Sequence, residues 1–221
     1  MSDHELSSGT GRLLAGVTWA LLLLGLWLWG REVTEAPAGI PGAATGDVAA
    51  VGRPDGAALP PAARPLGEAL PQRIDIPDLG VQAPVVARGL DGQGAVDPPP
   101  FDQAGVVGWY AAGAKPGAAG TALMVGHVDT RTRPAVFYRI SALRPGESVK
   151  VVRSDGRVAE FTVDDVRVLP RDRFDAQQAY GPREPGRAEL RLITCGGTFD
   201  RASRSYTANV VVSAYLTGTG P

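Results

Sequence analysis

Short apolar runs of strand length, separated by glycine and proline, constrain the fold of this chain more than any other feature. They begin with RIDIP at Arg73 and continue through TALMVGH, ELRLITC and TANVVVSAYL. The stretch ESVKVVRSDGRVAEFTVDDVRVL predicts a hairpin, because its two alternating runs meet at the turn dipeptide Asp155–Gly156. Helical stretches are expected only near 134–140 and 173–180. Many short strands with few helices predict an all-β sandwich or barrel.

The chain before Arg73 has a different composition and predicts three further segments. Residues 1–12 are short and polar, and residues 13–30 (LLAGVTWALLLLGLWLWG) carry no charge. As a helix this run spans about 27 Å, close to the hydrocarbon thickness of a bilayer. We therefore expect a transmembrane anchor at 13–30 after a cytoplasmic tail at 1–12. Residues 31–72, rich in Pro, Gly and Ala, predict a linker to a folded domain at 73–221.

Two other interpretations of the uncharged run remain open. A cleaved signal peptide is one, since the APA of residues 36–38 loosely fits a cleavage site. The run is longer than the roughly 7–15 apolar residues of a signal core, which favours the anchor. A helix of a soluble core is the other, and it is disfavoured because the run has no polar face.

Composition excludes several classes of function. The formal net charge is −1 and aromatic-basic repeats are missing, which argues against nucleic-acid binding. One cysteine cannot form an internal disulfide, and one Cys with two His makes a zinc cage improbable. The acidic pair Asp164–Asp165 lies on a predicted strand, where alternation places one carboxylate on each face, a poor chelate. We expect neither a metal nor a cofactor.

The single cysteine, Cys195, ends the run LRLITC and is followed by Gly196–Gly197. Alternation puts Leu190, Leu192 and Thr194 on one side of this strand and Arg191, Ile193 and Cys195 on the other. We expect the strand to stop at the glycines, which leaves the thiol beside exposed backbone N–H groups. This setting suits an acyl nucleophile, whereas a buried thiol that only fills the core is the alternative.

A cysteine nucleophile needs a partner that holds the thiolate. His4 precedes the predicted anchor, so His127, at the end of TALMVGH, is the candidate; a surface histidine in the GHVDT turn is the alternative. Arg201 and Arg204 follow the cysteine by six and nine residues and would supply a cation, unless they are solvated loop arginines. Asp129 either orients His127, lines a groove or serves as a turn residue.

These motifs together resemble the sortases of Gram-positive bacteria. The resemblance covers about residues 73–217 and rests on LITC, the GH of 126–127, RIDIPDLGVQAPVV, VGWY and FYRISALRPGESVKV. The forms GHVDT and TCGGTFDR…Y…NVVV are most similar to the actinobacterial class F group. The resemblance implies a closed β-barrel of about eight strands with a few short helices, behind the N-terminal transmembrane helix.

The resemblance also implies an activity and residue roles. Cys195 would be the nucleophile and His127 the acid/base, with Arg201 or Arg204 as the cation. Thr194, Asp129 and Asn209 would contact substrate, and Asn209 stands where many sortases begin the last strand with an arginine. The implied enzyme is a membrane-anchored cysteine transpeptidase whose catalytic domain lies outside the cell.

The implied partners are proteins with an LPxTG-like sorting motif and a cell-wall amine. The enzyme would cleave the motif between Thr and Gly through a thioacyl-enzyme and transfer the protein to the amine. A cysteine peptidase with water as acceptor, or a wall-facing binding domain with a structural thiol, are the alternatives.

Overall fold

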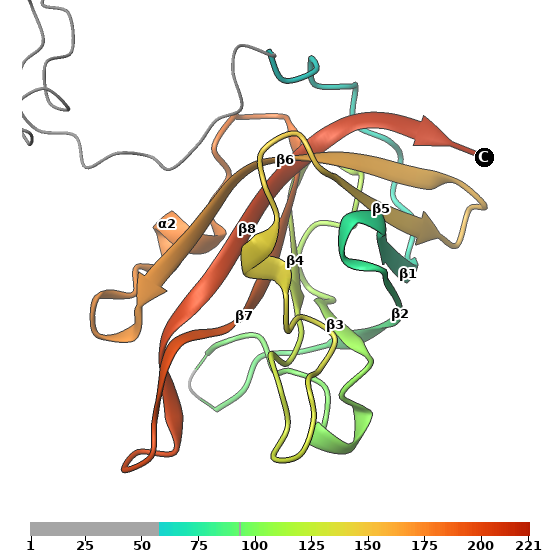
Figure 1. Cartoon of the computed structure of the whole chain (residues 1–221). Helices are drawn as coiled ribbons and strands as arrows, with labels where there is room; N and C mark the ends of the chain where they lie inside the picture. Colours follow the sequence, from blue (N-terminus) through green and yellow to red (C-terminus); the bar gives the residue numbers. More distant parts are fainter. Residues whose placement is uncertain (1–57, 93) are drawn as a thin grey trace, which may run out of the picture. The chain divides into compact units, whose positions relative to one another are not determined.

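A computed structural model describes residues 58–92 and 94–221 of the chain, and eight strands of this part close into a barrel (Figure 1). The all-β prediction is confirmed. The strands are β1 (Pro71–Ile76), β2 (Val81–Arg88), β3 (Val107–Tyr110), β4 (Gly120–Val125), β5 (Ser148–Arg153), β6 (Val158–Pro170), β7 (Ala188–Asp200) and β8 (Ser205–Gly220). Short helices join them: η1 (Pro77–Leu79), η2 (Phe101–Gln103), η3 (Ile140–Ala142), η4 (Arg171–Arg173) and α2 (Ala176–Tyr180). The predicted anchor at 13–30 lies outside the described residues, and within them no helix is long and apolar enough to cross a membrane.

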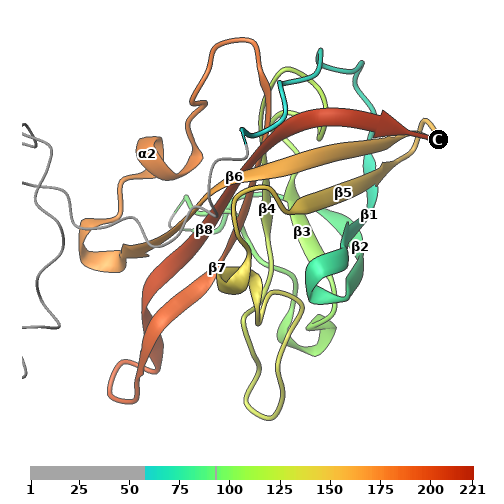
Figure 2. The ribbon, with the colours of Figure 1, turned by 45° about the horizontal axis from the view of Figure 1, so that its top comes forward.

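The strand order around the barrel is β1-β2-β3-β4-β7-β8-β6-β5 (Figure 2). Two neighbouring pairs are parallel, β2 with β3 and β4 with β7, and the other pairs are antiparallel. The predicted hairpin is confirmed as β5 and β6, joined at Asp155–Gly156. The parallel pairing of β4 with β7 matters most here, because it aligns two segments far apart in the sequence.

Alternation along the central strands divides the apolar residues into two clusters. The inner cluster fills the barrel and includes Met124, Leu190, Leu192 and Val212. The outer cluster lies on the opposite face of β4, β7 and β8 and is covered by side chains of the β2–β3 and β6–β7 connections. Its buried members are Val96, Leu123, Val125, Ala179, Ile193 and Val211. The predicted two-sided pattern of LRLITC is therefore confirmed.

β7 does not stop at Gly196–Gly197, and that prediction was wrong. The strand continues to Asp200, which pairs with Ser205, and the register shifts between Gly196 and Phe199. The glycines permit close approach of β8 instead of ending the strand. A Cβ on Gly196 would lie 2.5 Å from Val210 Cγ2, and Gly197 has φ +75°.

The acidic pair on β6 also differs from its prediction. The register of β6 against β8 shifts between Val163 and Asp165, so Asp164 is the extra residue of a bulge. Both carboxylates then reach one guanidinium, with Arg183 Nη1 3.3 Å from Asp164 Oδ1 and Arg183 Nη2 2.5 Å from Asp165 Oδ2. With strict alternation the two carboxylates would lie on opposite faces, and only one of them could reach Arg183.

Residues 58–70, assigned to the linker by composition, follow the barrel surface. Ala63 N donates to Leu216 O at 2.8 Å, and Tyr215 Oη donates to Pro60 O at 2.6 Å. The buried Arg153 donates to Gly67 O at 2.6 Å. This segment is held at the carboxyl end of β8, away from the end that pairs with Cys195.

Candidate active site

The parallel ladder between β4 and β7 brings Cys195 and His127 to one end of the sheet. Its last pair is Val125 with Ile193, and Gly126 N continues it by donating to Ile193 O at 3.1 Å. Thr194 Oγ1 donates to Gly126 O at 2.8 Å and ties the two strand ends together. His127 and Cys195 each follow two residues after the last pair. Because neighbouring strands lie about 4.8 Å apart, His127 and Cys195 occupy neighbouring backbone positions at this end of the ladder.

His127 is held by the connection between β2 and β3. Its Nε2 lies 2.6 Å from Pro99 O, and because a carbonyl oxygen only accepts, Nε2 carries the hydrogen. The ring also stacks on Phe101, with centroids 4.2 Å apart and planes inclined by 17°. Phe101 is 69% exposed, so the stack forms the outer wall of the site.

Cys195 is exposed, yet the charges around it do not all favour the thiolate. Partial burial of the thiol raises the pKa of Cys195; the guanidinium of Arg171 lowers it and the carboxylate of Asp129 raises it further. The net direction is upward. At neutral pH most molecules therefore hold a neutral thiol, and the nucleophile must form from a minor thiolate population or by proton transfer during the reaction.

Asp129 has a partner that sequence reasoning did not identify. Tyr206, near the start of β8, donates a short hydrogen bond from its hydroxyl to Asp129 Oδ2. This bond, together with burial and the nearby negative charge, raises the pKa of Tyr206 to about 12. The hydroxyl therefore stays protonated and holds Asp129 against β8. The signal available in the sequence is the tyrosine of TCGGTFDR…Y…NVVV, whose spacing from Cys195 does not by itself indicate a role.

The two other predicted contact residues occupy defined positions. Asn209 pairs with Cys195 across the β7–β8 ladder and is half-buried. Thr194 is buried and its hydroxyl is committed to Gly126 O, so it orders the strand ends. Asn209 thus lies at the site directly, while Thr194 lies beneath it.

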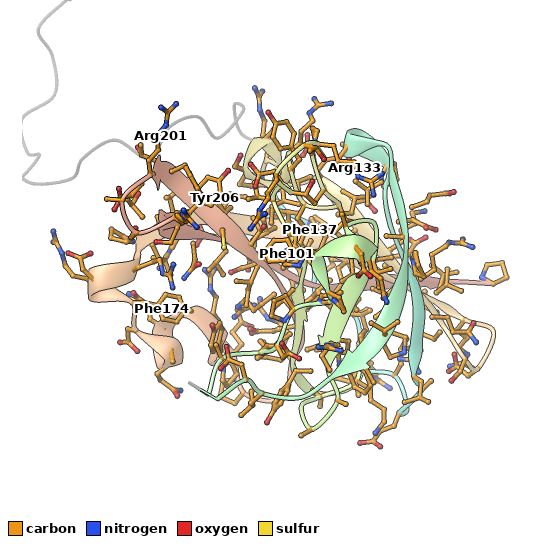
Figure 3. All side chains as sticks on the ribbon, turned by 90° about the horizontal axis from the view of Figure 1, so that it is seen from below. Phe101, Arg133, Phe137, Phe174, Arg201 and Tyr206 are labelled. Carbon is orange, nitrogen blue, oxygen red and sulfur yellow. The ribbon has the colours of Figure 1, made fainter. Side chains whose placement is uncertain are left out.

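Arg201 and Arg204 are not brought to the thiol. Asp200 pairs with Ser205, so both arginines belong to the turn beyond the last pair of the hairpin, and both are exposed. Five residues of strand separate Cys195 from Asp200, roughly 17 Å. Figure 3 shows Arg201 at the tip of the hairpin, farther out than Tyr206. The catalytic role of either arginine stays a prediction.

A buried ion pair anchors the β6–β7 connection at the other end of β7. Arg191 Nη2 lies 2.6 Å from Glu189 Oε2, and neither residue is more than 1% exposed. Glu189 also accepts hydrogen bonds from the backbone N–H groups of Arg183 and Glu184. Arg191 in turn donates to Gly181 O at 3.0 Å. These bonds join β7 to the β6–β7 connection, and we call them the clamp.

Among residues 58–92 and 94–221, no three His, Cys, Asp or Glu side chains are placed to hold a metal ion.

The thiol of Cys195 on β7 and the imidazole of His127, just after the parallel strand β4, thus belong to neighbouring segments of a closed barrel. The sequence profile of the Sortase domain matches residues 74–217, and the chain belongs to this family. No match was found among curated proteins.

Solved structures share the fold. Sortase C-1 from Actinomyces oris is 21% identical, with TM-score 0.50 and coverage of 66% of this chain and 73% of that one. Sortase A from Corynebacterium diphtheriae is 18% identical, with TM-score 0.51 and coverage of 70% and 64%. The SrtA sortase from Actinomyces oris is 20% identical, with TM-score 0.52 and coverage of 76% and 89%. The resemblance to class F stays a prediction.

Proposed function

We propose that this chain is a membrane-anchored sortase that cleaves an LPxTG-like motif between Thr and Gly and transfers the acyl part to a cell-wall amine. The observation that carries the proposal is the β4–β7 register, which aligns His127 with Cys195 at one sheet end. The Sortase domain match supports the reaction class. The uncharged run at 13–30 supports a single-pass anchor in the cell membrane. The proposed reaction requires the barrel to lie outside the cell, where its substrates emerge.

The chemistry follows from the two side chains. The thiolate of Cys195 attacks the Thr carbonyl carbon, a C–S bond forms and the carbonyl electron pair moves to oxygen. Collapse of this intermediate breaks the Thr–Gly bond, and the imidazolium of His127 protonates the departing amine. The incoming amine then attacks the thioester, loses a proton to the neutral imidazole and releases Cys195. With Nε2 bound to Pro99 O, the proton to be transferred resides on Nδ1 of the imidazolium.

Mass spectrometry with peptides of the LPxTG type tests the proposal. We expect an acyl adduct on Cys195 and, with an added amine, the transpeptidation product. Cys195→Ala is the matched control and should give neither. Hydrolysis that an amine cannot divert would identify a peptidase, and an inert thiol with every peptide would contradict the enzyme.

A further inference from the structure

The site as described lacks a positive charge on the hairpin beside Cys195. A thiolate and the oxyanion that follows it both gain from a nearby cation. The two arginines of the β7–β8 turn lie beyond Asp200, roughly 17 Å along the strand from the thiol. That distance is longer than an arginine side chain, so the cation must come from another element.

The strand on the other side of β8 ends beside the site. β6 pairs with β8 at Leu169–Asn209 and Pro170–Ala208, and Asn209 also pairs with Cys195. Leu169, Asn209 and Cys195 therefore form one row across three strands. Leu169 packs against the outer cluster, which places this row on the outer face.

Arg171 follows two residues after Leu169. Pro170 has an extended backbone, with φ −57° and ψ 139°, so the alternation of β6 carries on and Arg171 returns to the outer face. Two strand spacings and two residues of rise separate its Cα from that of Cys195, about 12 Å. An arginine side chain covers much of this span.

The guanidinium of Arg171 extends toward β8. Its Nη1 donates to Tyr206 O at 3.5 Å, a long bond that leaves most donors free. The residue also lines, together with Arg173, an open hollow of about 880 Å³ between η4 and the β7–β8 hairpin, so it is accessible from solvent. Its neighbour Arg173 is 83% exposed and lies 3.7 Å from Asp172.

The charged and titratable groups around Cys195 come from three elements. They are Arg171 from η4, Asp129 and His127 from the segment after β4, and Tyr206 from β8. Arg171 lowers the pKa of the Cys195 thiol, opposing Asp129. Tyr206 is held neutral by Asp129.

We propose that Arg171, and not an arginine of the β7–β8 turn, supplies the positive charge that faces Cys195. The inference rests on the proposed function for its role in catalysis. The guanidinium stabilises the thiolate before attack, and its free N–H groups face the oxygen that takes the electron pair when the C–S bond forms. The leaving amine still takes its proton from His127.

Alkylation of Cys195 by iodoacetamide across pH tests the charge without any peptide. In the full chain we expect Arg171→Gln to move the midpoint of the alkylation profile upward by about 0.5–1 pH unit. Arg171→Lys, which keeps the charge, should leave the midpoint near the wild-type value. Arg173→Gln is the matched control and should not move it.

Acyl transfer to an amine gives the second readout. We expect Arg171→Gln to lower kcat/KM about 10²–10³-fold, and Arg171→Lys to recover only part, because lysine lacks the planar fork. Thermal unfolding of each variant shows whether a loss reflects folding. Loss of transfer in Arg201→Gln or Arg204→Gln with wild-type behaviour of Arg171→Gln would overturn the assignment.

The two readouts separate this inference from the proposed function. A shifted alkylation profile in Arg171→Gln, with no acyl transfer by the wild-type chain, supports the charge assignment and refutes the transpeptidase. Normal transfer and an unchanged alkylation profile in Arg171→Gln refute the assignment and keep the transpeptidase.

Discussion

Two regions of β7 place polar side chains in opposite environments. At the amino end, Glu189 and Arg191 are fully buried, and each is paired with a charged group or a backbone partner. In the carboxyl-terminal half of the strand, Cys195 is exposed and lies among charges that oppose one another. A buried polar group whose hydrogen bonds are all satisfied stabilises the fold, whereas a group whose neighbouring charges do not balance is available for chemistry.

Removal of the thiol should have the largest effect and leave the clamp untouched. We expect Cys195→Ala to lower acyl transfer at least about 10³-fold with no loss in the free energy of unfolding. The measurement is single-turnover transfer beside urea denaturation. A destabilised Cys195→Ala would show that the thiol is a packing residue after all.

Breaking the clamp should have the opposite effects, a loss of stability with unchanged reactivity of the thiol. We expect Glu189→Gln to lower the free energy of unfolding by about 3–5 kcal/mol, because it leaves Arg191 buried without its charge partner. In the molecules that remain folded, the alkylation rate of Cys195 should be that of the wild type. A change in thiol reactivity without loss of stability would contradict the assignment of a structural role to the clamp and a chemical role to Cys195.

The clamp also predicts a pH dependence of its own. Burial raises the pKa of Glu189, but hydrogen bonds from Arg183, Arg191 and Glu184 outweigh it and the net pKa is lowered. A lowered pKa stabilises the fold above the unfolded value, about 4.3, and this stability is lost as pH falls through the folded value. The stability gap between wild type and Glu189→Gln should therefore narrow in acid, which urea titrations at pH 7 and pH 3.5 measure.

A smaller effect concerns the charges around Cys195. Asp129 raises the pKa of Cys195, so Asp129→Asn should shift the alkylation profile to lower pH. Tyr206→Phe keeps the carboxylate but frees it from its hydroxyl donor, so the profile should not shift downward. Iodoacetamide kinetics compare the two variants. A downward shift in both would mean that the hydrogen bond between Tyr206 and Asp129, not the charge of Asp129, determines the pKa of the Cys195 thiol.

The smallest effect concerns the wall of the site. Phe101→Ala removes the stack on His127, and an aromatic pair contributes about 0.5–1.5 kcal/mol, so kcat/KM should fall about tenfold or less. Leu90→Ala removes another exposed apolar side chain of the same β2–β3 connection and serves as the control. Equal losses in both variants would point to the connection as a whole.

The fold was predictable where local pattern and tertiary structure agree. Alternation in LRLITC gave the two faces of β7, and Asp155–Gly156 gave the β5–β6 turn. The pattern failed at Asp164 and at Gly196–Gly197, because a bulge and a close strand approach are set by the neighbouring strand, which a single segment does not encode.

The site was predictable in part for a related reason. Cys195 and His127 stand out because their residue types are rare in this chain and both follow strand runs. Tyr206 and Arg171 do not stand out, since the chain has five tyrosines and many arginines. Their relevance depends on pairing between β6, β8 and the segment after β4. Spacing along the chain favours Arg201 and Arg204, but the long β7–β8 hairpin places both at its turn, away from Cys195.

The pairing of β8 with two neighbours also has a mechanical consequence. The hydrogen bond from Ala63 to Leu216 joins the incoming chain to this strand seven residues, roughly 23 Å, from Asn209. Tension arriving through residues 58–63 would load the far end of β8 in shear, where both neighbours β6 and β7 share it. Strain along the backbone would thus be dissipated in the barrel wall before it disturbed the spacing between sulfur and imidazole.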